Sequence, residues 1–454
     1  MDKKKIEELV KVAKKYVWTS LSDYADIEKE LKIFVKGEGC YLTDIHGKRY
    51  LDTFASLLTT ICGHHRPEIA RAVQEQMEKL EFFPSYHDCY TVPVIRLAEK
   101  LASLAPGDLS VSFFVNDGSE ACESAIKMAR QYFWQKGEPS RYKIIGRRYS
   151  YHGATLGALS ATGLPDFAEP FQPLLSPGFS HAMSTWCYHC ELGLEPSSCN
   201  LACLKNMEQV ILGEKLETVA AVIVDPIPGS NIGYPVPPDG YLQGLRALCD
   251  NYGIFLIFDE IQVGFGKTGK FFCCENWKVV PDFLCLAKGF SGGYLPMGVV
   301  IAKSEIADEF RRAGKDFRHG FTFSGNPTVA AAVLANIEII EKERLVEKAA
   351  TIGKFLKERL KGLYKYPIVG DIRGMGTLWA IELVANKKSK VPLNPKLKVG
   401  TYIRDHCWKN GMILRNNGDI LVIAPALIIT KSEVDEMIRL MEQAIQDAIK
   451  HFNL

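Results

Sequence analysis

Lys288 stands where a lysine could act as a nucleophilic amine. It follows an apolar run that ends at Ala287, and a glycine-rich turn over residues 289–293 comes directly after it. Partial burial at such a place lowers the pKa of a lysine, which makes its neutral amine available to attack an aldehyde. A single lysine in a loop is more often a solvated surface group, so this position gains weight only from the residues that accompany it.

Asp259 and Glu260 form a pair of acids at the end of another apolar run, residues 254–258. A carboxylate at the end of a buried strand costs free energy unless a partner compensates its charge. A protonated pyridine nitrogen would be a suitable partner for Asp259, and its charge would make the ring an electron sink. A salt bridge or a helix N-cap is the alternative interpretation of this pair.

Two further loops have chemistry that suits a phosphorylated ring. Residues 113–120 read as a strand, a tight turn containing Gly118, and the start of a helix, whose free backbone N–H groups favour a phosphate. Tyr151 follows the strand-like run 142–145 and could stack on a planar ring. A capped helix and a packed core tyrosine are the structural alternatives.

The cysteines form a separate question. Thirteen cysteines in 454 residues do not make a disulfide scaffold, and we expect free thiols in a reducing cytosol. The spacing C-x2-C, eight residues, C-x3-C could hold zinc or an iron–sulfur cluster. We predict no metal and free thiols that pack a loop, with a structural metal as the alternative. The four residues are Cys187, Cys190, Cys199 and Cys203.

A parallel sheet would bring these loops together. Apolar runs alternate with helical stretches, which predicts βαβ units and a mostly parallel sheet covered on both faces. Ligands bind such sheets beyond the carboxyl ends of the strands, where the loops above would lie. The predicted strands are residues 111–115, 142–145, 219–224, 254–258 and 299–302.

The two ends of the chain predict a second, smaller unit. Residues 39–44 and 48–52 are strand-like, and a long helix opens after Asn326 with a proline at its first position. Residues 430–433 form a capping box that starts the last helix. We therefore predict an α/β protein with a large domain, residues 61–329, and a small α+β domain built from residues 1–60 and 330–454.

Composition excludes several classes of partner. The chain is 47% hydrophobic and 24% charged, with a net charge of +2, so nothing suggests a nucleic-acid or membrane partner. The N-terminus lacks the apolar stretch of a secretory signal, and its apolar positions from Ile6 to Val17 mark an amphipathic helix. No apolar run is long enough to cross a bilayer. We expect a cytoplasmic protein that acts on small molecules.

Together, these segments resemble the class III (ω-amino acid) aminotransferases, in the family's order and over nearly the whole chain. The resemblance implies aminotransferase fold type I and the cofactor pyridoxal 5′-phosphate (PLP). The motif that starts at Asp259 and is followed by the lysine is highly specific. The matching motifs are Asn116–Ala121, Tyr151–Gly153, Asp259–Gly269, Lys288–Gly289 and Gly320–Pro327.

The resemblance also implies roles for single residues. Lys288 and Asp259 would be catalytic: Lys288 would bind PLP as a Schiff base and move protons, and Asp259 would pair with the pyridinium nitrogen. Thr322 would reach the phosphate in a neighbouring subunit, so a homodimer with shared active sites would be the functional unit, and dimers could pair into tetramers. The cofactor-binding residues would be Gly118, Ser119, Tyr151, His152, Asp259, Gln262, Lys288, Phe321 and Thr322, and the substrate-binding residues Arg415, Trp18, Leu58 and Tyr151.

Departures from the family pattern bear on the substrates. Ser230 stands where glutamate-using relatives place a glutamate that pairs with the carboxylate-binding arginine, here Arg415. We therefore expect pyruvate as acceptor and a ping-pong transfer through pyridoxamine phosphate from an ω-amino acid or amine. Asp225 replaces the family's glutamate before Pro226, and Leu58 replaces a common tryptophan, so the amine pocket could be wider. An amino-mutase, decarboxylase or racemase is the alternative, and the donor and stereochemistry stay open.

Overall fold

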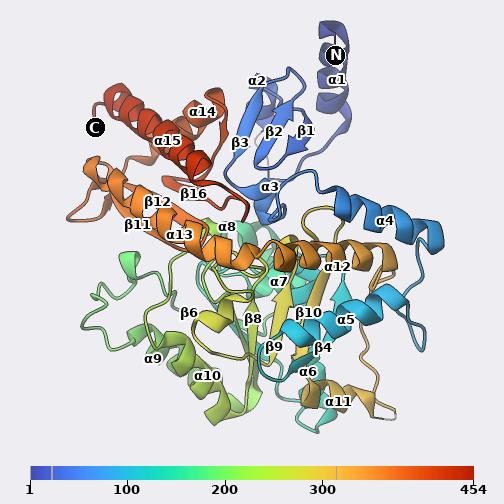
Figure 1. Cartoon of the computed structure of the whole chain (residues 1–454). Helices are drawn as coiled ribbons and strands as arrows, with labels where there is room; N and C mark the ends of the chain where they lie inside the picture. Colours follow the sequence, from blue (N-terminus) through green and yellow to red (C-terminus); the bar gives the residue numbers. More distant parts are fainter. Residues whose placement is uncertain (1, 22–23, 313) are drawn as a thin grey trace.

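A computed structural model describes residues 2–21, 24–312 and 314–454 (Figure 1). A seven-stranded sheet fills the lower part of the molecule in that view, and two smaller sheets, formed by the chain ends, fill the upper part. The mixed α/β architecture and the mostly parallel large sheet are as predicted.

The large sheet has the strand order β4-β10-β9-β8-β7-β5-β6. The pairs from β9 to β6 are parallel, whereas β10 runs antiparallel to both of its neighbours. The predicted strands are all present, and β6 and β9 are two additional ones. The strands are β4 Leu109–Val115, β5 Lys143–Arg147, β6 Phe179–Ala182, β7 Val219–Val224, β8 Phe255–Asp259, β9 Phe283–Leu286 and β10 Gly298–Lys303.

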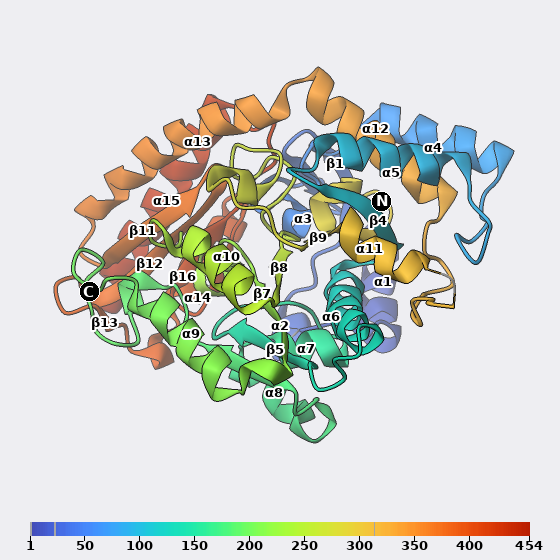
Figure 2. The same ribbon diagram turned by 90° about the horizontal axis from the view of Figure 1, so that it is seen from below.

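Helices cover both faces of this sheet, which explains why its strands are continuously apolar. In β7, Val222 and Val224 join one hydrophobic cluster, with α4, α5, α9, α10 and α12, while Ala221 and Ile223 join another, with α6, α7 and α11. Figure 2 shows α10 on one side of β7 and β8 and α6 on the other. The helices are α4 Pro67–Lys79, α5 Val92–Leu104, α6 Gly118–Gln135, α7 Leu156–Ala161, α9 Ala202–Gly213, α10 Tyr241–Tyr252, α11 Ser304–Arg311 and α12 Pro327–Lys342.

Both chain ends build the smaller part. β14 of the C-terminal region pairs in parallel with β3 near the N-terminus, which joins β1, β2 and β3 to the rest. A separate hydrophobic cluster lies here, under α13, α14 and α15. The strands are β1 Phe34–Glu38, β2 Tyr41–Asp44, β3 Arg49–Asp52, β11 Val369–Met375, β12 Leu378–Asn386, β13 Val391–Pro392, β14 Met412–Ile413, β15 Arg415–Asn417 and β16 Ile420–Ile423; the helices are α13 Leu345–Lys361, α14 Val399–Lys409 and α15 Lys431–Phe452.

The predicted domain boundaries, 60/61 and 329/330, stay a prediction. Helix α12 crosses the second of them, and its buried side chains pack with α4 and α5 in the cluster under the large sheet. Its N-cap is Asn326, as predicted, because the Asn326 side chain accepts hydrogen bonds from the Thr328 and Val329 amides. The capping box of α15 is also present, between Thr430 and Glu433.

Short elements connect these parts. They are α1 Lys3–Tyr16, α2 Tyr24–Lys29, α3 Ala55–Leu58, α8 Pro165–Ala168, η1 Glu169–Leu174, η2 Cys187–His189, η3 Leu216–Thr218, η4 Ser230–Ile232, η5 Cys273–Asn276, η6 Lys288–Ser291, η7 Gly362–Lys365 and η8 Pro395–Leu397. The predicted amphipathic N-terminal helix is α1, but Ile6 is its one buried side chain among the described residues. Much of its apolar face is therefore exposed within a single chain. None of the described helices is both long and apolar enough to cross a membrane.

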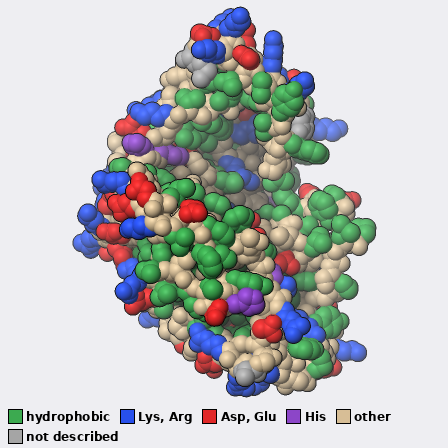
Figure 3. Space-filling view, turned by 90° about the vertical axis from the view of Figure 1, so that its right-hand side faces the viewer, with side chains coloured by type: hydrophobic (Ala, Val, Ile, Leu, Met, Phe, Trp, Pro, Cys, Tyr) green, Lys and Arg blue, Asp and Glu red, His purple; other side chains and the backbone are tan. Residues whose placement is uncertain are grey.

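Large apolar side chains are also exposed on α4, on α5 and on the segment between them. Figure 3 shows this side of the molecule, where hydrophobic side chains surround a hollow that holds basic ones. Exposed apolar side chains gathered on one side of a protein favour an interaction site there. The exposed residues here include Met77, Leu80, Phe83, Tyr86, Tyr90, Val92, Ile95 and Phe323.

Candidate active site

Most of the site residues predicted from the sequence line one cavity of about 590 Å³. It lies beyond the carboxyl ends of β5, β7, β8 and β9, where parallel strands bring their following loops to one edge of the sheet. A cavity of this size suits a cofactor together with a small substrate. The predicted residues that line it are Leu58, Gly118, Ser119, Tyr151, His152, Asp259, Gln262, Lys288 and Arg415.

Lys288 follows β9 and begins the short helix η6. Burial lowers the pKa of Lys288 to about 8, an effect that nearby Asp259 opposes and Arg415 reinforces. A substantial fraction of its amine is therefore neutral near pH 7 to 8. The residue also has a left-handed backbone, with φ of 51°.

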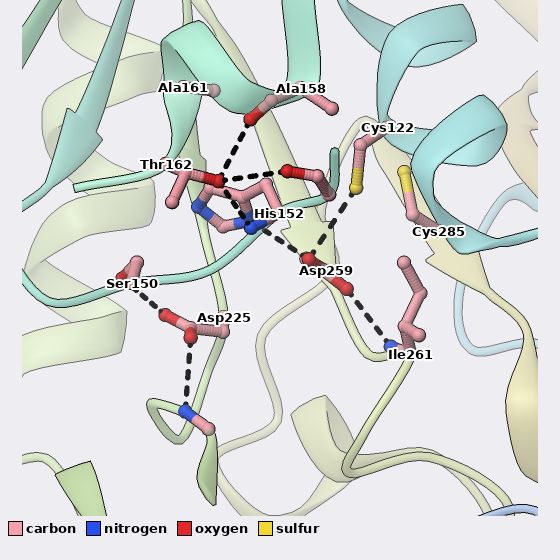
Figure 4. A network of polar contacts seen from close by, with 12 residues as sticks. Cys122, Ser150, His152, Ala158, Ala161, Thr162, Asp225, Asp259, Ile261 and Cys285 are labelled. Atoms are coloured by element: carbon pink, nitrogen blue, oxygen red, sulfur yellow. Dashed lines mark hydrogen bonds and ion pairs between the residues drawn. The ribbon is translucent and has the colours of Figure 1, made fainter. Parts of the chain in front are cut away.

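Asp259 ends β8 and is buried at 4% exposure. Its Oδ2 accepts a hydrogen bond from His152 Nδ1 at 2.8 Å and one from the Cys122 thiol at 3.5 Å (Figure 4). Its Oδ1 accepts a bond from the Ile261 amide at 3.0 Å. Both carboxylate oxygens of Asp259 therefore have protein donors, and the side chain lines the cavity where it could pair with a pyridinium nitrogen.

His152 holds the Asp259 side chain in place. Burial alone would lower the pKa of His152, but the hydrogen bond to Asp259 and the Cys122 thiol raise it to about 10. The imidazole is therefore protonated near neutral pH and forms a buried ion pair with Asp259. The Thr162 hydroxyl, which accepts a bond from the His152 amide at 2.9 Å, fixes the backbone of this segment.

The first turn of α6 faces the cavity with Gly118 and Ser119. Backbone N–H groups at the first turn of a helix have no acceptor within the helix, so they suit a phosphate. Asp117 caps the helix by accepting a bond from the Glu120 amide at 2.9 Å. Gly153, with φ of 143°, lets its segment approach this turn, because a Cβ there would lie 2.8 Å from Ser119.

Gln262 and Tyr151 line the same cavity as Gly118, Ser119 and Lys288. Gln262 is fixed because its Oε1 accepts a hydrogen bond from the Ser230 amide at 3.1 Å. The Tyr151 ring contacts Phe167 edge to face, with ring centres 5.7 Å apart, and burial raises the pKa of its hydroxyl. Both side chains are thus held by protein contacts, and their predicted roles toward a cofactor ring stay predictions.

Arg415 begins β15 and contributes a half-buried cation to the cavity. Burial lowers the pKa of its guanidinium, and Tyr234 is the nearby group that opposes this effect. Among the described residues, no carboxylate forms an ion pair with Arg415. The uncharged Ser230 also lines the cavity, so an incoming carboxylate would meet this arginine without an acidic partner.

Three predicted residues lie away from the cavity lining. Trp18 is 89% exposed, and its role toward the substrate stays a prediction. Thr322 is exposed, and Phe321 is half-buried, with its ring 4.8 Å from that of His319. The predicted role of Thr322 concerns a neighbouring subunit, so one chain does not test it.

A buried ion pair next to the cavity was not predicted from the sequence. Arg147, fully buried at the end of β5, donates to Asp225 Oδ1 at 2.8 Å, and the Ser150 hydroxyl donates to the same oxygen at 2.6 Å. Asp225 Oδ2 accepts a bond from the Gly229 amide at 3.2 Å. The pair holds together the loops after β5 and β7. The feature of the sequence that could have indicated this ion pair is a charged residue, Arg147, at the end of an apolar strand.

Glu260 has a structural role rather than a place in the cavity. Its carboxylate accepts hydrogen bonds from the Cys273 and Cys274 amides at 2.5 and 2.6 Å, at the start of η5. Burial raises its pKa to about 7. Of this acid pair, Glu260 therefore binds the free amides at the start of η5 from outside the helix, and Asp259 lines the cavity.

The four spaced cysteines line a small cavity of about 20 Å³, separate from the large one. They are Cys187, Cys190, Cys199 and Cys203. All are half-buried and unpaired by disulfides. Within the part of the chain that the structure describes, the one group of three or more His, Cys, Asp or Glu ligand atoms within 4.8 Å of one another is Cys122, His152 and Asp259. The sulfurs are thus not gathered as in a filled tetrahedral site, and whether they bind a metal stays a prediction.

The residues of the large cavity fit pyridoxal phosphate. A helix start with a small-residue turn suits its phosphate, an anionic Asp259 suits its ring nitrogen, and a partly neutral Lys288 suits its aldehyde. All three groups line one cavity beyond the carboxyl ends of a mostly parallel sheet. Fold and site together define a PLP-dependent enzyme of the aminotransferase type.

Comparison with known proteins places the chain more closely. The family described as "Aminotransferase class-III" matches residues 24–445. A putrescine–pyruvate aminotransferase of Pseudomonas aeruginosa is 36% identical over 95% of this chain and 96% of its own length. An adenosylmethionine-8-amino-7-oxononanoate aminotransferase of Geobacter sulfurreducens is also 36% identical, with the same shares covered. The crystal structure of an (S)-enantioselective ω-transaminase from Thermomicrobium roseum superimposes with a TM-score of 0.94 at 40% identity, covering 98% of this chain and 99% of that one.

The chain therefore belongs to the class III aminotransferases, which are PLP-dependent enzymes. The family, the fold and the cofactor predicted from the motifs are confirmed. The relatives named here are aminotransferases, which favours aminotransferase activity over the amino-mutase, decarboxylase and racemase alternatives.

Proposed function

We propose that this aminotransferase moves an amino group from an ω-amino acid or primary amine to pyruvate in a ping-pong reaction. The observation that carries the choice of acceptor is Arg415, a cation in the cavity with no acidic partner among the described residues. Pyruvate has one carboxylate and a methyl group, so it needs one cation and an otherwise apolar wall. The similar putrescine–pyruvate enzyme agrees with this choice.

The donor side of the cavity supports an amine with an apolar body. Its wall includes Leu57, Leu58, Leu164, Phe167 and Ile227. Burying apolar substrate surface against such side chains is worth about 25 cal/mol per Å². We therefore propose that donors with an aliphatic or aromatic body and a terminal amine bind better than small, highly charged ones.

The chain's own residues would divide the work. Pyridoxal phosphate, when bound, supplies an electron-withdrawing ring that weakens the C–H bond next to the substrate nitrogen. The Lys288 amine, with its pKa near 8, can take a proton from the substrate carbon and return it. Asp259, held by His152, would pair with the ring nitrogen. Arg415 orients the oxo-acid through its carboxylate.

A donor and acceptor screen tests the proposal. Putrescine, β-alanine, taurine, 4-aminobutyrate and aryl-alkyl amines are each paired with pyruvate and with 2-oxoglutarate, and the keto or aldehyde product is measured. We expect pyruvate to be preferred by at least about tenfold in kcat/KM, which corresponds to about 1.4 kcal/mol. Equal or better use of 2-oxoglutarate would contradict the proposed acceptor.

We also propose that two copies of the chain form the functional unit. Thr322 and Phe323 lie on the surface, and Phe323 packs on Phe82 beside the exposed apolar residues of α4 and α5. A second copy would cover this surface and bring its Thr322 to the cavity. Light scattering should give a mass of at least twice 50.7 kDa, and a monomer with full activity would refute the shared site. The predicted cytoplasmic location stays a prediction.

A further inference from the structure

The short helix α3 has the wrong hand for L-amino acids. Its four residues, Ala55, Ser56, Leu57 and Leu58, have φ values of 44°, 44°, 67° and 69°. Non-glycine residues visit this left-handed region as single residues and rarely in succession, because Cβ approaches the following carbonyl oxygen. Four in a row persist only where surrounding groups hold them.

Backbone hydrogen bonds close the turn but do not explain its hand. The Leu58 amide donates to the Phe54 carbonyl, and the Thr59 amide donates to the Ala55 carbonyl, each at 2.9 Å. These bonds resemble those of a helical turn, which a right-handed backbone would make with less steric cost. Groups outside the turn must therefore select this conformation.

Asp52 supplies these outside contacts. Its Oδ2 accepts hydrogen bonds from the Ser56 amide at 2.7 Å and from the Ser56 hydroxyl at 3.0 Å, and its Oδ1 accepts one from the Phe54 amide at 3.1 Å. His64 Nε2 lies 3.1 Å from Oδ2 and holds the carboxylate in place. Asp52 is 2% exposed and is fixed at the end of β3, so its position is set by the sheet.

The turn forms part of the wall of the active-site cavity. Leu57 and Leu58 line this cavity together with Lys288. The residues after the turn pack against that segment: a Cβ at Gly293 would lie 2.9 Å from Thr59 Oγ1, and one at Gly289 would lie 3.0 Å from Ile61. The left-handed turn thus connects the apolar wall with the loop that carries Lys288.

We propose that Asp52, held by His64, is a positioning residue that sets the shape of the donor pocket by keeping residues 55–58 in a left-handed turn. It acts through Leu57 and Leu58 and does not itself touch the substrate. The proposal rests on the proposed use of amine donors. The assay uses whichever acceptor the parent enzyme prefers, so a wrong acceptor would not be mistaken for failure of this inference.

Asp52→Asn tests the proposal in the holoenzyme. The amide keeps the shape of the side chain but replaces one acceptor oxygen with an N–H donor that would face the Ser56 amide. We expect kcat/KM for an aryl-alkyl amine to fall by about tenfold, because losing one apolar contact in a pocket typically changes kcat/KM by about this factor. The kcat/KM for a small amine should change less. The KM for the acceptor and the absorption of the bound cofactor should stay as in the parent.

Asp44→Asn is the matched control. Asp44 is also a buried carboxylate of the same sheet, and it accepts bonds from the His46 and Lys48 amides and from the Tyr50 hydroxyl, each at 2.9 Å. It does not line the cavity, so its loss should lower stability without changing donor preference. If both variants change the donor preference equally, or Asp52→Asn leaves it unchanged, the proposal is wrong.

A rescue distinguishes positioning from a general loss of fold. Glycine adopts left-handed backbone without steric cost, so Ser56→Gly added to Asp52→Asn should restore most of the lost preference for the larger amine. No recovery in a folded double variant would overturn the inference. If Asp52→Asn does not fold, His64→Ala replaces it, because that change frees the carboxylate to rotate and should shift donor preference in the same direction.

Discussion

His152→Leu should reveal the worth of the ion pair that holds Asp259. Burial lowers the pKa of His152, but its hydrogen bond to Asp259 and the nearby Cys122 thiol raise that pKa from 6.5 to about 10. The two pKa values of His152 differ by about 3.5, and each pKa unit corresponds to about 1.4 kcal/mol, so the protonated imidazole contributes about 5 kcal/mol to the free energy of unfolding. Breaking a buried ion pair by removing one partner typically costs about 3–5 kcal/mol, in the same range.

The pH dependence gives the prediction its sign. Because the folded-state pKa is raised, the contribution is complete below pH 6.5 and is lost as the pH rises through about 10. At pH 8 about 3 kcal/mol should remain, and at pH 10 less than about 1 kcal/mol. The gap in stability between the parent enzyme and His152→Leu should therefore close on going from pH 6.5 to pH 10.

Urea unfolding with the cofactor removed measures this gap, since Asp259 then has its protein partners alone. His181→Leu is the control: His181 is a half-buried histidine whose Nε2 lies 3.1 Å from the Ala161 carbonyl, and partial burial lowers its pKa. Loss of that neutral hydrogen bond should cost about 1 kcal/mol, with little pH dependence over the same range. A gap for His152→Leu that is equal at pH 6.5 and pH 10, or no larger than that of the control, would refute the reasoning.

Further predictions concern the chemistry of the site. Lys288→Ala should abolish both turnover and the yellow colour of the enzyme. In the parent enzyme, the donor half-reaction should speed up as the pH rises from 7 to 9, because the Lys288 amine loses its proton near pH 8. Stopped-flow absorbance measures the rate of this half-reaction, and a rate that does not change with pH would contradict the prediction. Ser230→Glu should lower kcat/KM for pyruvate by about tenfold or more by pairing with Arg415, as measured by alanine formation; an unchanged value would show that the two side chains do not meet. Protein purified without chelators should contain less than about a tenth of an equivalent of zinc or iron if the four spaced cysteines are free thiols, and a stoichiometric metal found by elemental analysis would reverse that prediction.

Particular residues show how far the sequence allowed the site to be predicted. Asp259 ends β8 and Gly118 comes shortly after β4, and both strands were predicted, so the place of these residues at the carboxyl edge of the sheet follows from local pattern. Lys288 comes shortly after β9, whose apolar run was recognised although the strand was not predicted. Strands β6 and β9 were missed because they are four residues long and give little periodic signal. The antiparallel direction of β10 depends on how the chain returns to the sheet, which local sequence does not encode.

Contacts between distant segments could not be predicted either, because local sequence does not encode which segments meet in the fold. Asp259 and His152 are 107 residues apart, and Arg147 and Asp225 are 78 apart, so no spacing rule relates them. The left-handed backbone of residues 55–58 contradicts their local propensity and depends on Asp52 and His64.

The sequence by itself determined the family, the cofactor and the identity of the groups that could hold it, since contiguous motifs on strands and turns carry this chemistry. Only the tertiary structure decided which partner each buried charge meets, whether Arg415 faces an acid, and how Leu57 and Leu58 shape the donor wall. The physical reason is that burial and pairing energies depend on atoms brought together from distant parts of the chain, whereas motif chemistry depends on neighbours in sequence.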